Sequence, residues 1–198
     1  MSYAIIGFGK IGQALARAFA RNGLDVSVAT TRDPESFAAD AAAIGPSIIP
    51  KTLAEAVKAD IIFLAVRFEA HADVAKALPN WNGKTIVDAT NRFPAPEGPE
   101  DPPSSAIVAR AFTGAKLVKG FNHLIAATLA TDPVVEGGRR VVFLSSDDEN
   151  AAAPVAALAT RLGFAPIALG KLGEGGALVH ARGRAWGPLI FQDLFKKA

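Results

Sequence analysis

Short apolar segments alternate with helix-type segments along most of this 198-residue chain. The segments at 3–7 and 60–66 are short apolar runs, and the second is apolar on both faces, which is typical of strands covered on both sides. The segment at 11–23 carries apolar residues at helical spacing and stops at Asn22-Gly23, a helix-end signal. This alternation predicts an α/β fold with a doubly wound, mostly parallel sheet.

The same patterns predict the remaining elements. Strands are expected at 25–30, 47–50, 84–90, 115–121, 139–146 and 164–169, and helices at 33–43, 52–59, 69–78, 104–112, 148–163 and 187–197. Asp33 before Pro34 and Thr52 are the expected helix caps. The five prolines at 94–103 exclude regular structure there. No repeat or interdomain linker interrupts the chain, so residues 1–198 are expected to form one domain.

Composition excludes several kinds of site and partner. Half of the residues are hydrophobic, which argues against disorder. The net charge is +2 and no long charge run occurs, so no nucleic-acid partner is expected. Cysteine is absent, which excludes disulfides and thiolate chemistry, and no cluster of metal ligands appears. Because no leader pattern and no bilayer-length apolar run is seen, we expect a cytoplasmic protein without a membrane partner.

A glycine-rich turn lies between the first expected strand and the first expected helix. Gly7, Gly9 and Gly12 have GxGxxG spacing, and this position in an alternating pattern is what makes that spacing a dinucleotide fingerprint. Gly7 permits the tight turn, Gly9 lets a pyrophosphate approach the backbone, and Gly12 lets helix and strand pack closely. The N–H groups that begin the helix would then face the phosphates. The alternative is a tight turn without a ligand.

The end of the second expected strand indicates which dinucleotide binds. An NAD site usually has Asp or Glu there, whereas this chain has Thr30, Thr31 and Arg32. Two hydroxyls and a guanidinium suit a 2′-phosphate, so NADP(H) is the predicted cofactor. Asp33 is the competing ribose ligand, although its place before Pro34 fits a cap better. Arg32 as an ordinary exposed arginine is the other alternative.

Polar groups follow three further strands, whose carboxyl ends are expected to share one edge of the sheet. The nicotinamide half of the cofactor is expected near Ala65, Val66, Arg67, Ala89, Thr90 and Asn91. Asp88 is a further polar group expected near the nicotinamide, and a structural role as a strand-end cap explains it equally well. Asn122 and His123 follow the strand at 115–121 and reach the same edge. His123 is a candidate acid–base catalyst, although a lone histidine among apolar residues is more often structural.

Several segments together resemble the NADPH-dependent coenzyme F420 reductase family of small oxidoreductases. The likeness covers nearly the whole chain, including the C-terminal segment 187–194, and is carried by residues 7–32, 59–75, 83–91, 119–124 and 143–164. It implies a Rossmann domain with a small C-terminal lobe, taken as residues 165–198 on the substrate side. It also implies hydride transfer between NADPH and a second ring system, a deazaflavin or flavin, bound in the cleft between them.

Roles carried over from the resemblance fall on three segments. The resemblance implies a phosphate loop at Gly7, Phe8, Gly9, Lys10 and Ile11, adenosine-phosphate contacts at Thr31 and Arg32, and a nicotinamide wall at Ala65 and Val66. The chain departs from the family at two positions near the expected reaction centre. The family commonly has proline where this chain has Arg67 and a threonine-like residue where it has His123.

A glycine-rich stretch at 170–187 is the candidate site for the second substrate. Glycines let a backbone approach a flat ligand, arginines bind phosphate or carboxylate, and tryptophan offers a ring face. The candidate contacts are Asn122, His180, Arg182, Arg184 and Trp186. The alternative is a flexible exposed connection. A second subunit could complete this pocket, and we expect a homodimer.

Three functions are compatible with these features. The first is an NADPH-dependent deazaflavin or flavin reductase, in which the two ring systems carry the chemistry. The second is a small carbonyl or imine reductase that uses His123 as its acid. The third is a non-catalytic NADP-binding sensor domain. The sequence favours the first and does not identify the second substrate.

Overall fold

The computed structural model describes residues 1–94, 102–180 and 195–196. The strands are β1 (Tyr3–Ile6), β2 (Val26–Ala29), β3 (Ile48–Pro50), β4 (Ile61–Leu64), β5 (Thr85–Asp88), β6 (Lys116–Gly120), β7 (Val134–Val135), β8 (Gly138–Arg139), β9 (Val141–Ser145), β10 (Ala165–Ala168) and β11 (Phe195–Lys196). The α-helices are α1 (Lys10–Arg21), α2 (Ala38–Ile44), α3 (Leu53–Ala56), α4 (His71–Ala75), α5 (Ser104–Ala111), α6 (Ala126–Ala130), α7 (Glu149–Arg161) and α8 (Gly175–Leu178). Two 3₁₀ helices, η1 (Pro34–Phe37) and η2 (Phe68–Ala70), precede α2 and α4.

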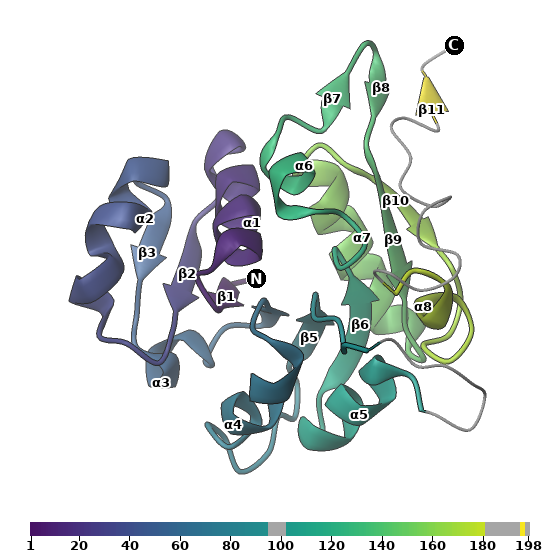
Figure 1. The fold of residues 1–198 in the computed structure, drawn as a ribbon, viewed down its shortest axis with the longest axis horizontal. Helices are drawn as coiled ribbons and strands as arrows, with labels where there is room; N and C mark the ends of the chain where they lie inside the picture. The colour runs from purple at the N-terminus through teal and green to yellow at the C-terminus, as the bar shows by residue number, and fades with distance from the viewer. Residues whose placement is uncertain (95–101, 181–194, 197–198) are drawn as a thin grey trace.

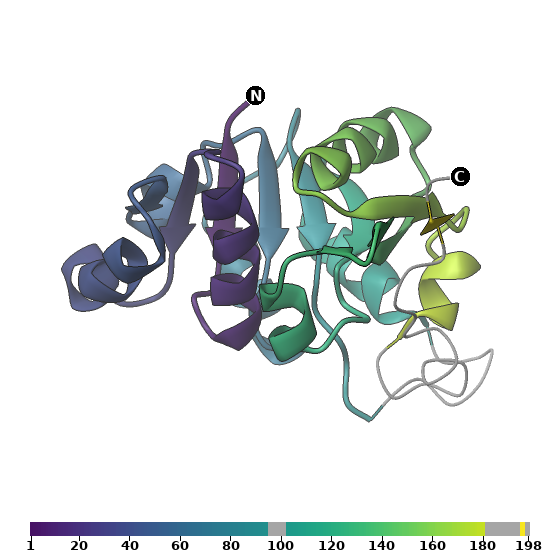
Figure 2. The same cartoon turned by 90° about the horizontal axis from the view of Figure 1, so that it is seen from above.

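Eight strands form one sheet in the order β10-β9-β6-β5-β4-β1-β2-β3. The six strands from β3 to β6 in that order are parallel, whereas β9 runs antiparallel to β6 and pairs in parallel with β10. Helices cover both faces of the sheet (Figures 1 and 2). The predicted doubly wound, mostly parallel α/β fold is therefore confirmed.

The central strands are apolar on both faces because each face meets its own layer of helices. Ile5 and Phe63 belong to the cluster beneath α1, α2, α6 and α7. Their chain neighbours Ile6 and Leu64 belong to the cluster beneath α3, α4 and α5. All four side chains are at most 2% exposed. Continuous burial of this kind explains why these strands show no polar alternation.

A row of aromatic rings connects the helix layer to the carboxyl end of β6. The ring centroids of Tyr3, Phe19, Phe63, Phe121 and Phe164 follow one another at 5.4 to 5.8 Å. Phe121 has a φ of 61°, in the left-handed region that bulky residues seldom adopt. Its burial against Phe63 and Phe164 holds this conformation, and the chain therefore turns sharply as it leaves β6.

The two expected helix caps differ in outcome. The cap at Thr52 is confirmed, since Thr52 Oγ1 accepts from the Glu55 N–H at 3.3 Å and Glu55 Oε2 accepts from the Thr52 N–H at 3.0 Å. Asp33 stands at the start of η1, but its side chain makes no capping hydrogen bond there. Its carbonyl instead accepts from the Ser36 N–H and Oγ. The helix expected at 33–43 accordingly begins as a 3₁₀ turn.

Several short elements were not expected from the sequence. α6, the β7–β8 hairpin and α8 are each too short to show a clear period. The prediction of a helix at 187–197 is wrong at Phe195–Lys196, because these residues form β11 and pair with β8. The rest of that expected helix lies outside the described residues. β10 belongs to the main sheet, and the lobe boundary at residue 165 stays a prediction.

Candidate cofactor and substrate site

The three glycines of the fingerprint occupy different environments. Gly7 has a φ of 101°, and a Cβ on it would lie 2.4 Å from the Ala65 carbonyl oxygen. A Cβ on Gly12 would lie 1.9 Å from the Gly7 carbonyl oxygen. Gly9 has an ordinary φ of −79°, and a Cβ there would meet nothing within 4 Å. The fold thus requires Gly7 and Gly12, whereas Gly9 faces open space.

α1 begins directly after Gly9, which is its N-cap residue and has no side chain to occupy the first N–H groups. The first turn of α1, which the structure describes completely, carries no acidic residue. Uncapped N–H groups and the positive end of the helix dipole attract an anion. A 12-residue helix that opens onto the space beside Gly9 therefore has the geometry of a phosphate site.

A cleft of about 480 Å³ passes over this turn. Nine of the fifteen residues predicted to bind the cofactor line this cleft: Gly7, Phe8, Gly9, Thr30, Thr31, Arg32, Ala65, Val66 and Arg67. The other six predicted residues do not line it: Lys10, Ile11, Gly12, Ala89, Thr90 and Asn91. Five further described residues line the cleft and were not predicted, namely Ile6, Leu53, Ala70, Asp73 and Val74. Four of them lie on the short helices α3, η2 and α4, whereas the predicted residues follow the ends of strands.

The end of the cleft beside β2 carries the residues expected at the 2′-phosphate. Thr30 Oγ1 accepts from the Arg32 N–H at 2.9 Å, which fixes the turn after β2. The Arg32 guanidinium lies 5.7 Å from the ring centroid of buried Phe37. Thr31 and Arg32 are exposed. Their polar groups therefore face solvent and the cleft, where a phosphate could reach them.

The other end of the cleft lies where β4 leaves the sheet. Ala65 donates its N–H to the Ile6 carbonyl at 2.8 Å, so β4 stays paired to β1 up to the cleft wall. Ala89, after β5, donates to the Leu64 carbonyl at 3.2 Å. The start of the loop after β5 thus lies next to Ala65 and Val66 along the same edge, although Ala89, Thr90 and Asn91 do not line the cleft.

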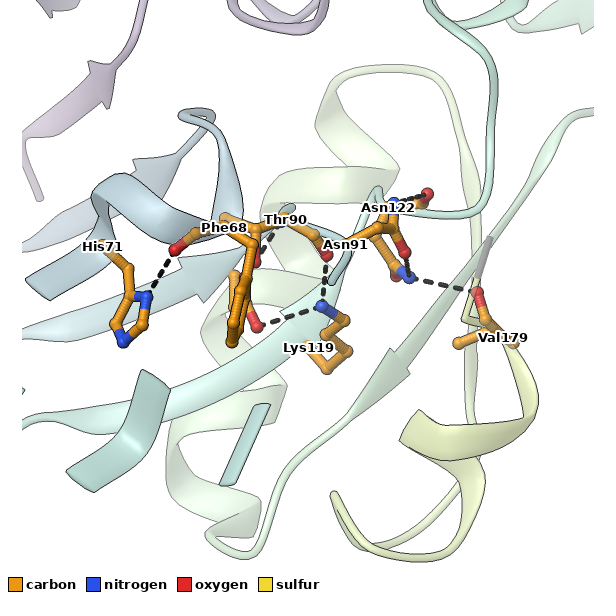
Figure 3. Close-up of polar contacts among 8 residues, drawn as sticks. Phe68, His71, Thr90, Asn91, Lys119, Asn122 and Val179 are labelled. Atoms are coloured by element: carbon orange, nitrogen blue, oxygen red, sulfur yellow. Dashed lines mark hydrogen bonds and ion pairs between the residues drawn. The ribbon is translucent and has the colours of Figure 1, made fainter. Parts of the chain in front are cut away.

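A buried ion pair lies beneath that loop. Lys119 Nζ is 3.0 Å from Asp88 Oδ2, and their side chains are 1% and 0% exposed. Lys119 Nζ also donates to the Thr90 carbonyl. Thr90 in turn donates its N–H and Oγ1 to Asp88 Oδ1, at 2.9 and 2.7 Å (Figure 3). The prediction of a strand-end cap at Asp88 is confirmed by these contacts.

Asn91 and Asn122 join the loops that follow β5 and β6. Asn91 Nδ2 donates to the Asn122 carbonyl at 2.8 Å, and Asn122 Nδ2 donates to Asn91 Oδ1 at 3.1 Å. Asn122 Nδ2 also donates to the Val179 carbonyl at 3.0 Å (Figure 3). The two loops and the segment after α8 are therefore fixed to one another by these amides.

His123 is buried, with 1% of its surface exposed. Its ring lies 5.0 Å from that of Phe143, and Nε2 is 3.3 Å from the Val141 carbonyl oxygen. Burial lowers the pKa of His123 to about 4, although the bond to Val141 opposes that shift. The imidazole is therefore neutral near pH 7 and is enclosed by the core, which favours a structural role over proton donation.

We expect His123 to make the folded state less stable in mild acid. Its pKa of about 4 lies below that of an unfolded histidine, so the unfolded chain binds the extra proton first as the pH falls. Stability should fall by about 2 kcal/mol between roughly pH 8 and pH 5 from this group alone. Carboxyl groups with lowered pKa, such as Asp60, act only at more acidic pH. The free energy of unfolding in urea should fall with pH over this range in the wild type, and this fall should be lost in His123→Asn. An equal fall in both proteins would contradict the prediction.

The expected substrate contacts in the C-terminal stretch are only partly visible. His180 is 5% exposed, and its ring meets the Phe93 ring edge-on with centroids 6.0 Å apart. Arg182, Arg184 and Trp186 lie outside the described residues. Within the described ranges, no group of His, Asp or Glu side chains could hold a metal ion. No helix in those ranges is long and apolar enough to cross a bilayer.

Comparisons with known proteins agree with the α/β fold and with NADP(H) as the cofactor. Residues 2–92 match the model of the family described as NADP oxidoreductase, coenzyme F420-dependent. A hypothetical protein of Sinorhizobium meliloti is 38% identical, with a TM-score of 0.89, and the match covers 100% of this chain and 96% of that one. A protein of Arthrobacter assigned as an F420-dependent NADP reductase is 27% identical, with a TM-score of 0.71, over 100% and 99% of the two chains.

Human metalloreductase STEAP2 is 29% identical over 174 residues. That match covers 87% of this chain but only 34% of the metalloreductase. The chain therefore spans about a third of the length of the curated relatives it matches, and the remaining two thirds of those proteins have no counterpart in the alignment.

Proposed function

Because this chain belongs to the family of coenzyme F420-dependent NADP oxidoreductases, we propose that it transfers a hydride between NADP(H) and the ring of a deazaflavin or flavin. The chain is an NADP-dependent oxidoreductase, and its cofactor is NADP(H). What we propose in addition is the class of the second substrate and the role of each residue in the cleft.

The open space beside Gly9 supports this function most directly. The cleft extends from Arg32 after β2 across Gly9 to Ala65 and Val66 after β4. A dinucleotide laid along it would have its 2′-phosphate at Thr31 and Arg32 and its pyrophosphate over Gly9 at the start of α1. Its nicotinamide would then lie against Ala65 and Val66. A Cβ at Gly9 would fill part of this space, so the missing side chain fits the proposed ligand.

The protein's own part in the reaction is to bind, orient and exclude water. NADPH supplies the hydride when it is bound, so no side chain need donate one. The N–H groups at the start of α1 hold the phosphates, and Ala65 and Val66 present an apolar wall that orients the reactive ring. His123 is neutral and enclosed near pH 7. A transfer between two rings therefore agrees with this site better than one that needs His123 as an acid.

The second substrate is proposed to bind on the C-terminal side of the nicotinamide end. Asn122 and His180 are its proposed contacts among the described residues. The other three proposed contacts, Arg182, Arg184 and Trp186, lie outside them. Arginines suit the phosphate of a flavin mononucleotide or of a phosphorylated deazaflavin. We further propose that the protein acts as a cytoplasmic homodimer.

NADPH oxidation tests this function directly. The loss of NADPH absorbance is followed with a deazaflavin, with flavin mononucleotide, and with a panel of ketones and imines. Turnover is expected with one of the flavin-type compounds. In His123→Asn, checked for folding, the rate should stay within about threefold of the wild type, because no proton donor takes part in the hydride step.

Two outcomes would contradict the proposal. Turnover of a ketone or imine together with a roughly hundredfold loss in His123→Asn would indicate a carbonyl or imine reductase with His123 as its acid. Tight NADPH binding without turnover of any of these compounds would rule out a deazaflavin or flavin as the second substrate.

A further inference from the structure

The Lys119–Asp88 ion pair has no part in the function as described so far. Removing an ion pair from water costs desolvation energy. A protein in which apolar residues of similar size replace such a pair is often at least as stable. Lys116, on the same strand as Lys119, lies at the same 3.0 Å from Asp148 at the start of α7, but these two side chains are 45% and 35% exposed. The buried pair, at 1% and 0% exposure, therefore needs an explanation that an ordinary surface pair does not.

The geometry of the pair centres on the backbone turn that ends β5. Asp88 and Lys119 are direct partners in the register of β5 and β6. One carboxylate oxygen of Asp88 accepts from the N–H and hydroxyl of Thr90, and the other faces the ammonium. The ammonium also donates to the Thr90 carbonyl. The turn at 88–90 is thus held by contacts of the Asp88 carboxylate, of the Thr90 N–H and hydroxyl, and of the Thr90 carbonyl.

This restraint extends beyond the turn itself. The next residue, Asn91, exchanges amide hydrogen bonds with Asn122, and Asn122 bonds to the Val179 carbonyl. α8 also packs close to the lysine, since a Cβ on Gly176 would lie 3.8 Å from the Lys119 side chain. Figure 3 shows the contact from Lys119 to Thr90 and the contacts from Asn91 through Asn122 to Val179, and the peptide bond between Thr90 and Asn91 joins the two sets.

The restrained loop lies at one end of the cofactor cleft and not at the other. The carboxyl ends of β2, β1, β4 and β5 follow one another along the sheet edge. The cleft is lined by residues that follow the first three of these strands, namely Arg32 after β2, Gly7 after β1 and Ala65 after β4. β5 is next in line, with Asp88 paired to Leu64, the residue before Ala65. The loop at 89–91 therefore borders the end assigned to nicotinamide, far along the edge from Arg32.

We propose that Lys119, together with Asp88, is a positioning residue that sets the nicotinamide end of the cleft. The pair fixes the backbone of Thr90 and Asn91, and through Asn122 it fixes the loop after β6. It touches neither cofactor nor substrate. This inference rests on the proposed placement of NADP(H), with its adenosine phosphate at Arg32.

A matched set of variants separates positioning from general stability. Lys119→Met removes the ammonium and leaves a buried carboxylate without its cation, so the fold should also lose stability. Lys119→Met combined with Asp88→Asn removes both charges, while the new amide keeps an oxygen that can accept from Thr90, so stability should return towards the wild type. Lys116→Met removes an exposed lysine from the same strand and is the control.

Affinities for NADPH and for 2′,5′-ADP, which is its adenosine half, are measured by calorimetry with each protein. In Lys119→Met and in the double variant, the dissociation constant of NADPH should rise about tenfold or more while that of 2′,5′-ADP stays unchanged. Lys116→Met should change neither constant. Because no second substrate is present, a failure to reduce deazaflavin or flavin would count against the proposed function alone.

Either of two results would overturn the inference. Full recovery of NADPH affinity in the double variant, along with its stability, would mean that the pair serves only the fold. An equal loss for NADPH and 2′,5′-ADP would mean that the whole cleft has changed and not its nicotinamide end.

Discussion

Gly9→Ala is expected to abolish NADPH binding while the protein stays folded. The backbone at Gly9 has a φ of −79°, which alanine adopts without strain, and the added Cβ would meet no atom within 4 Å. The methyl group would instead project into the space where the pyrophosphate must approach the backbone. The dissociation constant of NADPH should rise by at least about a hundredfold, because the loss affects contacts to a charged group at the start of α1.

Fluorescence titration with NADPH measures this loss, and thermal unfolding shows whether the fold survives. The melting temperature of Gly9→Ala should stay within about 2 °C of the wild type. Gly12→Ala is the matched control in the same turn. Its Cβ would lie 1.9 Å from the Gly7 carbonyl oxygen, so this variant should lose stability as well as binding. An unchanged NADPH titration in Gly9→Ala would show that no phosphate passes over this residue.

The sheet could be predicted from the sequence because its strands are buried on both faces. Runs such as 60–66 have no polar alternation, and the structure places Ile62 and Phe63 in opposite apolar layers. The glycine turn could be predicted for a similar reason, since Gly7 and Gly12 are each required by a close backbone approach. Both signals can be recognised within a short stretch of sequence, although the atom that excludes a side chain at Gly7 is the distant Ala65 carbonyl oxygen.

Elements that depend on distant pairing could not be predicted. β11 exists because Phe195–Lys196 meet the edge of β8, more than fifty residues earlier, and the local pattern there had indicated a helix. The antiparallel direction of β9 is likewise set by its pairing with β6. α6 and the β7–β8 hairpin are shorter than the window in which periodicity becomes visible.

The candidate site divides in the same way. Thr31 and Arg32 could be placed because they follow β2 at the edge where this fold binds nucleotides. The buried ion pair between Lys119 and Asp88 was not predicted, although a signal was present in the sequence. A lysine inside the apolar run at 115–121 is costly to bury without a partner, and Asp88 ends the neighbouring strand at the same level.

Arg32→Ala is expected to weaken NADPH binding selectively and to leave NADH binding almost unchanged. The guanidinium is exposed at the β2 end of the cleft, where the turn is fixed by the bond from the Arg32 N–H to Thr30 Oγ1. Loss of a charge-assisted contact to the 2′-phosphate should cost about 1.5–3 kcal/mol, which is roughly tenfold to a hundredfold in affinity. NADH has no 2′-phosphate and therefore has no such contact to lose.

Arg67→Ala provides the matched control, because it removes the same charge from the other end of the same cleft. Both cofactors have identical nicotinamide halves, so any loss in Arg67→Ala should be equal for NADPH and NADH. The ratio of the two dissociation constants, measured by fluorescence titration, should therefore change in Arg32→Ala and stay constant in Arg67→Ala. The contribution of Arg32 should also shrink with added salt, because an exposed ion pair is screened. An equal loss of both cofactors in Arg32→Ala would show that Arg32 supports the turn after β2 and does not recognise the phosphate.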